Sequence, residues 1–287
     1  MKLGGKTYIL FLLLVFLGCQ DVVLPSYDPQ IVVEGWIEHD RAPIVLLSTT
    51  VSIDGSIKDN SDLKDHIIRW GKVTVSDGEK EVILTGKKDD RYFPPYIYTT
   101  SRLKGEAGKT YYLTVEYGGR TVKSYTTIPD PVPLEYIRCE RISNNKTDSA
   151  EKYVIIGGLK DNPETKDYYK VFTKVHGRDS TFESSFLGLI NDAIITEEIH
   201  EIPINKSTNL SGKIGHPFEP NKVVQIKFCT LDQKSWEYWT DFEEIQSLSR
   251  NPFFPITTDI RSNIQGGLGY WAGYGSTYYT VRIPSSE

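Results

Sequence analysis

The feature that most constrains the fold is an alternation of apolar and polar residues between Thr110 and Ile128. Successive side chains of a strand point to opposite faces, so a period of two predicts a strand with one buried face. In the first half of the segment the buried face would carry Tyr111, Leu113, Val115 and Tyr117. Gly118 and Gly119 follow, and two glycines can adopt the positive φ angles of a two-residue turn. The segment therefore predicts a β-hairpin.

Further strand patterns precede this hairpin, at residues 31–37, 43–51, 73–75 and 82–84. Asp77-Gly78 is a strong turn signal between the last two. The chain contains 18 tyrosines and one methionine, and aromatic residues favour strands. About seven short strands in roughly 100 residues are typical of a β-sandwich. We therefore expect an immunoglobulin-like or transthyretin-like sandwich over residues 30–130.

A proline-rich stretch, Pro129-Asp130-Pro131-Val132-Pro133, follows this region. Three prolines in five residues hold a chain extended and remove hydrogen-bond donors, so the stretch predicts a domain boundary. Strand patterns resume at residues 134–142, 153–159, 167–176 and 222–231. Residues 262–275 alternate small and aromatic side chains, which predicts a closing strand whose glycines allow close backbone approach. Residues 131–287 are thus expected to form a second β-sandwich-like domain.

One helix is predicted in this second domain, from about Gln233 to Leu248. Its aromatic and aliphatic side chains fall on one stripe at helical spacing, namely Tyr238, Trp239, Phe242 and Ile245. Asp232 can cap its start, and Asn251-Pro252 prevents it from continuing. Packing of the stripe against a sheet and an aromatic platform for a ligand are the two interpretations.

The N-terminus has the pattern of an export signal. Lys2 and Lys6 precede an apolar run at residues 8–17, which is too short for the about 20 residues of a membrane-spanning helix. The run ends in Leu17-Gly18-Cys19, which resembles the bacterial lipoprotein box. We expect a signal peptide at residues 1–18, lipid attachment to Cys19 and a tether at residues 19–29. An ordinary signal peptide with an incidental cysteine is the alternative.

Charge and residue types limit the chemistry that we expect of the mature chain. Removal of residues 1–18 leaves 31 basic and 38 acidic side chains, a net charge near −7, which argues against a nucleic-acid partner. The five histidines are scattered without metal-ligand spacing, so no metal site is predicted. No catalytic motif is found: Leu103 stands where a phosphate loop at Gly105–Thr110 would need its first glycine.

Two cysteines remain after processing, Cys139 and Cys229. The compartment beyond the inner membrane permits disulfides. A Cys139–Cys229 disulfide and two buried free thiols are therefore alternatives.

Taken in order along the chain, these features resemble DUF4249, a lipoprotein family of Gram-negative bacteria known as a domain of unknown function. The matching pieces are the lipoprotein box, residues 31–37, 105–111, 128–133 and 168–171, the aromatic helix, Asn251-Pro252-Phe253 and the tail from Ser262. The resemblance implies an outer-membrane-associated lipoprotein that is often encoded beside TonB-dependent receptors. It supplies no site residue except Cys19.

The function expected from these observations is that of a non-enzymatic accessory lipoprotein of the outer membrane. It would capture a small-molecule, glycan or peptide ligand or dock on a TonB-dependent receptor, because Tyr and Trp suit both interfaces and ligand stacking. It would need no cofactor other than the lipid on Cys19. A structural or adhesive surface protein and a hydrolase with an unrecognised site are the alternatives. No ligand-binding residues are predicted.

Overall fold

The computed structural model describes residues 28–51, 62–142, 151–160, 162, 164–195, 198–206, 217–248 and 259–285. Within these ranges the chain forms fifteen strands, two short 3-10 helices, η1 (Asp62–His66) and η2 (Asp192–Ile194), and the α-helix α2 (Gln233–Leu248). The predicted fold class, mainly β with β-sandwich architecture and one helix, is confirmed. The signal peptide, Cys19 and the Asn251-Pro252 helix stop lie outside the described residues.

The strands form three sheets. The largest has eight strands, in the spatial order β12 (Glu183–Asn191), β11 (Tyr168–Val175), β14 (Val223–Leu231), β15 (Leu268–Arg282), β1 (Ile31–Glu38), β2 (Ile44–Thr49), β6 (Tyr96–Thr99) and β5 (Thr85–Lys88). A four-stranded sheet has the order β4 (Glu81–Ile83), β3 (Lys72–Ser76), β7 (Thr110–Tyr117) and β8 (Arg120–Thr127). A three-stranded sheet has the order β13 (Ile199–Ile204), β10 (Lys152–Lys160) and β9 (Tyr136–Ile142).

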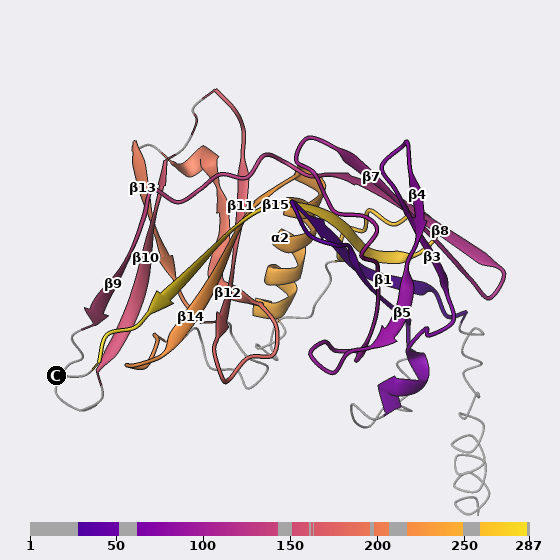
Figure 1. Ribbon diagram of the computed structural model, residues 1–287, viewed down its shortest axis with the longest axis horizontal. Coiled ribbons are helices and arrows are strands. Elements are labelled where there is room, and N and C mark those ends of the chain that lie inside the picture. Colours follow the sequence, from indigo (N-terminus) through magenta and orange to yellow (C-terminus); the bar gives the residue numbers. More distant parts are fainter. Residues whose placement is uncertain are drawn as a thin grey trace, which may run out of the picture.

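The last strand, β15, joins the two halves of the molecule. Its first part pairs in parallel with β1, from Val32 opposite Leu268 to Glu38 opposite Tyr274. From Tyr274 onward it pairs antiparallel with β14. The two predicted domains therefore share one continuous sheet, which bends at β15 so that the halves diverge and α2 lies between them (Figure 1).

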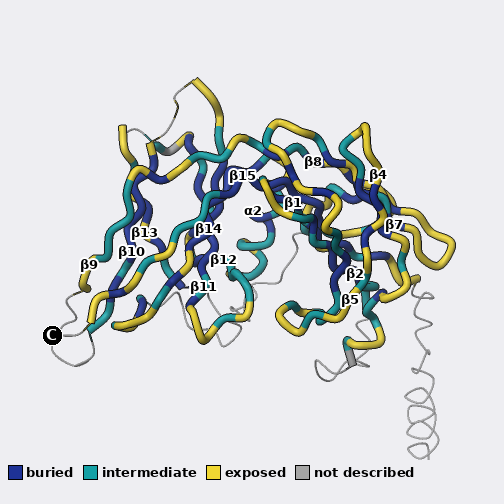
Figure 2. The backbone as a smooth tube through the Cα atoms, in the orientation of Figure 1, coloured by how far each residue is buried: buried dark blue, intermediate teal, exposed yellow. Residues whose placement is uncertain are grey.

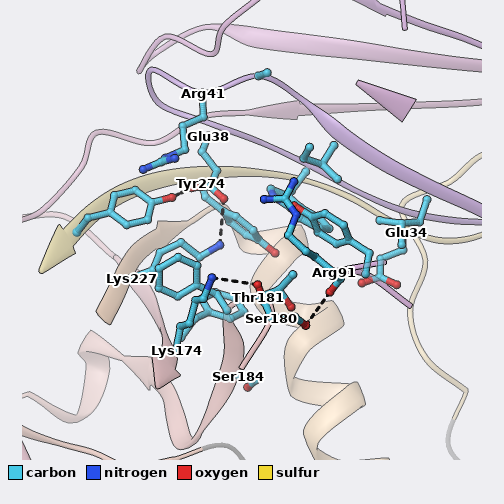
Figure 3. Close-up of a pocket in the computed structure, with 18 of the residues that line it drawn as sticks. Glu34, Glu38, Arg41, Arg91, Lys174, Ser180, Thr181, Ser184, Lys227 and Tyr274 are labelled. Atoms are coloured by element: carbon cyan, nitrogen blue, oxygen red, sulfur yellow. Dashed lines mark hydrogen bonds and ion pairs between the residues drawn. The ribbon is translucent and has the colours of Figure 1, made fainter. Parts of the chain in front are cut away.

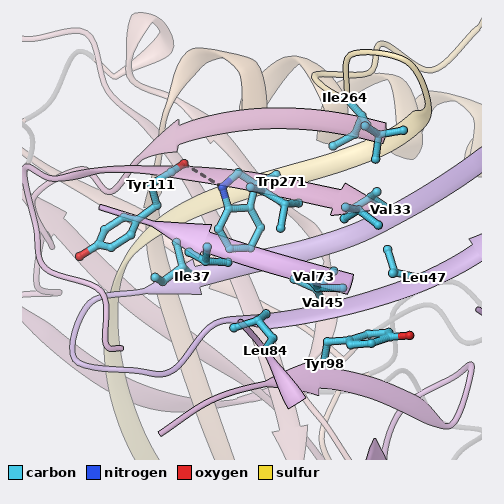
Figure 4. Packing of buried hydrophobic residues seen from close by; sticks show 14 of the residues in the cluster. Val33, Ile37, Val45, Leu47, Val73, Leu84, Tyr98, Tyr111, Ile264 and Trp271 are labelled. Atoms are coloured by element: carbon cyan, nitrogen blue, oxygen red, sulfur yellow. Dashed lines mark hydrogen bonds between the residues drawn. The ribbon is translucent and has the colours of Figure 1, made fainter. Parts of the chain in front are cut away.

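One face of this sheet packs on the four-stranded sheet and forms the first core. Trp271 of β15 is fully buried there, among Val33, Val45 and other aliphatic side chains (Figure 4). Its indole Nε1 donates a hydrogen bond to the carbonyl oxygen of Tyr111, at 3.0 Å. The predicted hairpin is confirmed as β7 and β8, with φ of 57° at Gly118 and 76° at Gly119.

The same face of the sheet packs on the three-stranded sheet farther along β15 and forms the second core. Its members come from β10, β11, β13 and β14, and include Ile155, Val171, Ile226 and Phe228, all without solvent exposure. Buried residues accordingly occur in both halves of the molecule and along the first part of β15 between them (Figure 2).

The glycines of β15 lie where other backbone segments cross it closely. A Cβ added at Gly273 would lie 2.6 Å from the carbonyl oxygen of Thr127, and one at Gly275 would lie 2.4 Å from that of Pro129. Both distances are far shorter than a normal contact, so a larger residue would displace the crossing chain. The predicted strand with close backbone approach is therefore confirmed from Leu268 onward, whereas residues 262–267 of the predicted range precede β15.

A third cluster of buried residues lies on the opposite, concave face of the large sheet. It contains Tyr168, Phe172, Leu231 and Tyr274 of the sheet, with Trp239 of α2 packed over them. Asp232 caps α2 as predicted, since its Oδ1 accepts a hydrogen bond from the backbone N–H of Ser235 at 2.7 Å. The helix thus fills part of the concave face and leaves the rest open.

Candidate functional site

The site begins with the alternation of side chains along β1. Val33 and Ile37 point into the first core and are fully buried. The alternate positions of the strand hold Glu34, Trp36 and Glu38. Their side chains therefore lie on the opposite face of the sheet. Two acids on either side of a tryptophan therefore project onto the concave face of the large sheet.

A cleft of about 620 Å³ opens on this face, between the two halves of the molecule (Figure 3). Its volume lies within the roughly 300–1,000 Å³ that is usual for small-molecule sites. Nine aromatic residues line it: Trp36, Tyr92, Phe93, Phe172, Phe182, Trp239, Tyr270, Tyr274 and Tyr278. Charged residues of both signs line it as well: Glu34, Glu38, Asp40, Arg41, Arg91, Lys174 and Lys227.

The deepest charges of the cleft form an ion pair between β14 and β1. The Nζ atom of Lys227 lies 3.0 Å from Oε1 of Glu38, and the two side chains are only 7% and 5% exposed. The hydroxyl of Tyr278 donates a hydrogen bond to the other carboxylate oxygen. Burial opposes ionisation of Glu38, but Lys227 and the Tyr278 hydroxyl outweigh it and lower the pKa of the carboxyl. Burial likewise opposes the charge on Lys227, yet Glu38 raises the pKa of its ammonium group. Both groups are therefore charged at neutral pH.

Aromatic rings surround the ammonium group of this pair. The Nζ atom of Lys227 lies 4.4 Å from the ring centroid of Phe172, 5.3 Å from that of Tyr274 and 5.6 Å from that of Phe182. A cation within about 6 Å of a ring face is attracted by its quadrupole. The walls of the cleft are thus built to stabilise a positive charge.

Glu34 differs from Glu38 in its partners. It is exposed to the cleft although it lies deep between the two halves of the protein. Its Oε1 accepts one hydrogen bond, from the hydroxyl of Tyr270 at 3.3 Å. Loss of hydration in this confined position raises the pKa of Glu34, and the Tyr270 hydrogen bond offsets only part of that effect. No cationic side chain pairs with Glu34 among the residues that the structure describes.

Two loops meet at the mouth of the cleft. Residues 89–95 connect β5 to β6, and residues 176–182 connect β11 to β12. The Ser180 hydroxyl donates a hydrogen bond to the carbonyl oxygen of Arg91 at 2.9 Å, and the Lys174 ammonium donates to the Ser180 carbonyl at 3.0 Å. The Tyr92 ring lies 6.2 Å from that of Trp36. The hydrogen bond between Ser180 and Arg91 connects the two halves across the opening, and the other two contacts hold each loop against its own half.

Helix α2 forms the remaining wall and is held by polar contacts to the sheet. Trp239 Nε1 donates to the Tyr274 hydroxyl at 3.1 Å. Lys170, which is fully buried in β11, pairs with Glu243 of the helix. Burial lowers the pKa of Lys170, and Glu243 offsets only part of that effect. Tyr238, Trp239 and Phe242 of the predicted stripe therefore pack in the cluster on the concave face of the sheet, and Trp239 also reaches the cleft.

The chain matches one family model, described as domain of unknown function (DUF4249), over residues 20–280. This match spans nearly the whole chain. The protein belongs to the DUF4249 family. No curated protein sequence matches it.

The two cysteines of this DUF4249 protein are free thiols in the structure. Cys229 is buried on the concave face beside Ser276, whereas Cys139 of β9 packs against the second core on the other side of the sheet. The two thiols are on opposite sides of the sheet, so the disulfide considered from the sequence is not formed. Burial raises the pKa of Cys229 to about 12, which leaves this thiol un-ionised and unreactive.

Other sequence expectations can be located on the DUF4249 fold. Cys19 lies outside the described residues, and no helix within them is long and apolar enough to cross a membrane. His39 pairs with Asp40, with 3.3 Å between Nε2 and Oδ2. The described ranges contain no group of three His, Cys, Asp or Glu side chains that could hold a metal ion.

Sequence reasoning assigned no ligand-binding residue and named only Trp239 of the cleft as part of a possible ligand platform, although two further signals were present. Glu34, Trp36 and Glu38 occupy every second position of an otherwise apolar strand, which directs them to one face. Lys170 and Lys227 each interrupt a buried apolar strand. A lysine in such a position needs a partner, and this requirement marks the face on which the cleft lies.

Proposed function

We propose that this DUF4249 protein is a lipid-anchored, non-enzymatic protein of the outer membrane that captures a small organic ligand in the cleft. We further propose that it acts as an accessory of a TonB-dependent receptor. The observation that carries the proposal is the cleft itself, about 620 Å³ in volume and lined by nine aromatic residues with charges of both signs. An apolar cavity with a few convergent polar groups is the usual form of a binding site.

The sequence of the N-terminus supports a membrane-proximal role for the cleft. The expected tether from Cys19 to residue 29 has eleven residues, which span at most about 40 Å when fully extended. Such a tether would keep the ligand-binding cleft close to the membrane and therefore to any integral receptor. The resemblance to proteins that are encoded beside TonB-dependent receptors makes such a receptor the partner to test.

The capture function is tested with a pair of tryptophan variants. Trp36 lines the cleft, whereas Trp70 is 89% exposed and does not line it. A panel of oligosaccharides and short peptides would be screened by thermal shift against the wild type, Trp36→Ala and Trp70→Ala, each compared with its own unliganded Tm. We expect at least one compound whose stabilising effect is retained in Trp70→Ala and lost in Trp36→Ala.

The partner is tested by affinity purification of a C-terminally tagged protein from detergent-solubilised outer membranes, followed by mass spectrometry. A stoichiometric TonB-dependent receptor is the expected result. Purification of the protein alone, together with no thermal shift from any compound, would favour the structural or adhesive alternative. A compound that still stabilises Trp36→Ala would show that the ligand binds elsewhere.

A further inference from the structure

The cleft contains two carboxylates in closely similar positions, one on each side of Trp36. Glu34 and Glu38 are each two residues from this tryptophan along β1, so all three side chains are on one face, with about 7 Å along the strand from each glutamate to Trp36. Each carboxylate accepts a hydrogen bond from a tyrosine hydroxyl of β15: Tyr270 donates to Glu34, and Tyr278 donates to Glu38. Both carboxylates thus accept from a tyrosine hydroxyl of the same strand, although Tyr270 lies directly opposite Glu34 and Tyr278 lies four residues beyond the partner of Glu38.

The two positions differ in the presence of a cation. Glu38 forms an ion pair with Lys227, with 3.0 Å between Oε1 and Nζ, and aromatic rings surround the ammonium group. Asp40 at the mouth pairs with His39. Among the described residues no lysine, arginine or histidine pairs with Glu34, although its side chain is exposed to the cleft.

The surroundings of Glu34 favour a cation over water. The rings of Tyr238 and Tyr270, 4.3 Å apart between centroids, stand on the side of α2 and β15, and Trp36 stands beside the carboxylate on β1. The confined position raises the pKa of Glu34, so its negative charge is poorly compensated. A ligand ammonium would supply both the missing charge and a group that aromatic faces attract.

We propose that the ligand captured in the cleft carries a protonated amino group on an apolar or aromatic body, and that Glu34 is the counter-ion of this group. The ammonium of the ligand forms a charge-assisted hydrogen bond with the Glu34 carboxylate, as Lys227 does with Glu38. The body of the ligand packs along Trp36 within a cavity large enough for a small organic molecule. This inference rests on the proposed capture function and specifies its ligand class.

Three probes of nearly equal size test the inference: tyramine, tyrosol and 4-hydroxyphenylacetate. They share a hydroxyphenyl ring and carry an ammonium, a hydroxyl and a carboxylate group respectively. Binding to the full mature chain would be measured by isothermal titration calorimetry at pH 7.5. We expect tyramine to bind about tenfold more tightly than tyrosol, the range of a charge-assisted hydrogen bond, and 4-hydroxyphenylacetate to bind least.

Two carboxylate variants assign the effect to a residue. Glu34→Gln keeps the size of the side chain and its ability to accept from Tyr270, and it should reduce the preference for tyramine over tyrosol to less than twofold. Glu81→Gln changes an exposed glutamate of β4 that is not part of the cleft, and it should retain the wild-type preference.

The outcomes separate this inference from the capture function. Equal binding of tyramine and tyrosol, with both lost in Trp36→Ala, would overturn the role of Glu34 and leave capture in the cleft intact. Tyramine binding that survives Glu34→Gln, or an absence of tyramine binding, would also overturn the inference. The oligosaccharide and peptide screen tests the capture function independently.

Discussion

The buried ion pair in the cleft allows a prediction of stability that follows directly from its geometry. Lys227→Met would remove the ammonium group and leave Glu38, whose side chain is 5% exposed, with the Tyr278 hydroxyl as its main remaining partner. Breaking a buried pair by removing one member costs about 3–5 kcal/mol, because the other charge stays buried. For a chain of this length the loss corresponds to a fall in Tm of roughly 6–20 °C.

The pH dependence of this loss gives a second, independent check. In the wild type, Glu38 has a lowered pKa, so its stabilising contribution is present above the ordinary pKa of glutamate and declines as the pH falls. In Lys227→Met, burial without the lysine should raise the pKa of Glu38, so the charged form becomes destabilising. The deficit should therefore be largest near pH 7 and should already be smaller at about pH 4, because the carboxyl of the variant becomes protonated as the pH falls through its raised pKa.

Urea denaturation of the wild type and the variants at pH 4 and pH 7 measures the free energies of unfolding. Lys72→Met is the matched control, since Lys72 also pairs with a glutamate, at 2.6 Å, but both side chains are about half exposed. It should leave the unfolding midpoint unchanged. The double variant Lys227→Met/Glu38→Gln should recover part of the loss. A deficit below about 1 kcal/mol in Lys227→Met, or one that is equal at both pH values, would refute the reasoning.

Three further predictions concern Glu34, the start of α2 and the anchor. Folding raises the pKa of Glu34, so the stability associated with its protonated form is lost as the pH rises. Glu34→Gln should therefore unfold at a higher urea concentration than the wild type at pH 7 but not at pH 3. Equal midpoints at pH 7 would contradict this. Asp232→Ala removes the N-cap of α2 and the acceptor of the Thr126 hydroxyl, and should cost about 1–2 kcal/mol by thermal denaturation; an unchanged Tm would argue against the cap. Cys19→Ala should move the protein from the membrane pellet to the soluble fraction, and a variant that still pellets after a carbonate wash would disprove lipid anchoring.

Local sequence patterns predicted those elements whose formation depends on residues that are close together in the sequence. The alternation of residues 110–117 and the following glycine pair specify a hairpin whose two strands are adjacent in the chain. The span of α2 follows from the aromatic stripe and from Asp232, and the glycines of β15 indicate close backbone approach. In each case the physical cause lies within a few residues, so the sequence carries it directly.

The cleft could not be predicted because its parts come from distant segments. Lys227 and Glu38 are 189 residues apart, and Tyr270 and Glu34 are 236 apart. A period of two assigns side chains to a face but does not say which strand lies beside it. The parallel pairing of β15 with β1 brings these residues together. The local sequence of neither strand indicates that the two strands pair.

The pairing of β15 with β1 also has a consequence for the order in which the molecule can be assembled. Residues 30–130 contain most of the first core, but Trp271, which is fully buried at its centre, is synthesised about 140 residues later. Until then β1 has an open edge and an uncovered apolar face, both of which favour aggregation. The first sandwich can therefore be completed only after β15, the last strand, has been synthesised. The export in an unfolded form that we predict from the N-terminal sequence would suit this order of events, because folding would then begin with both ends of the sheet present together.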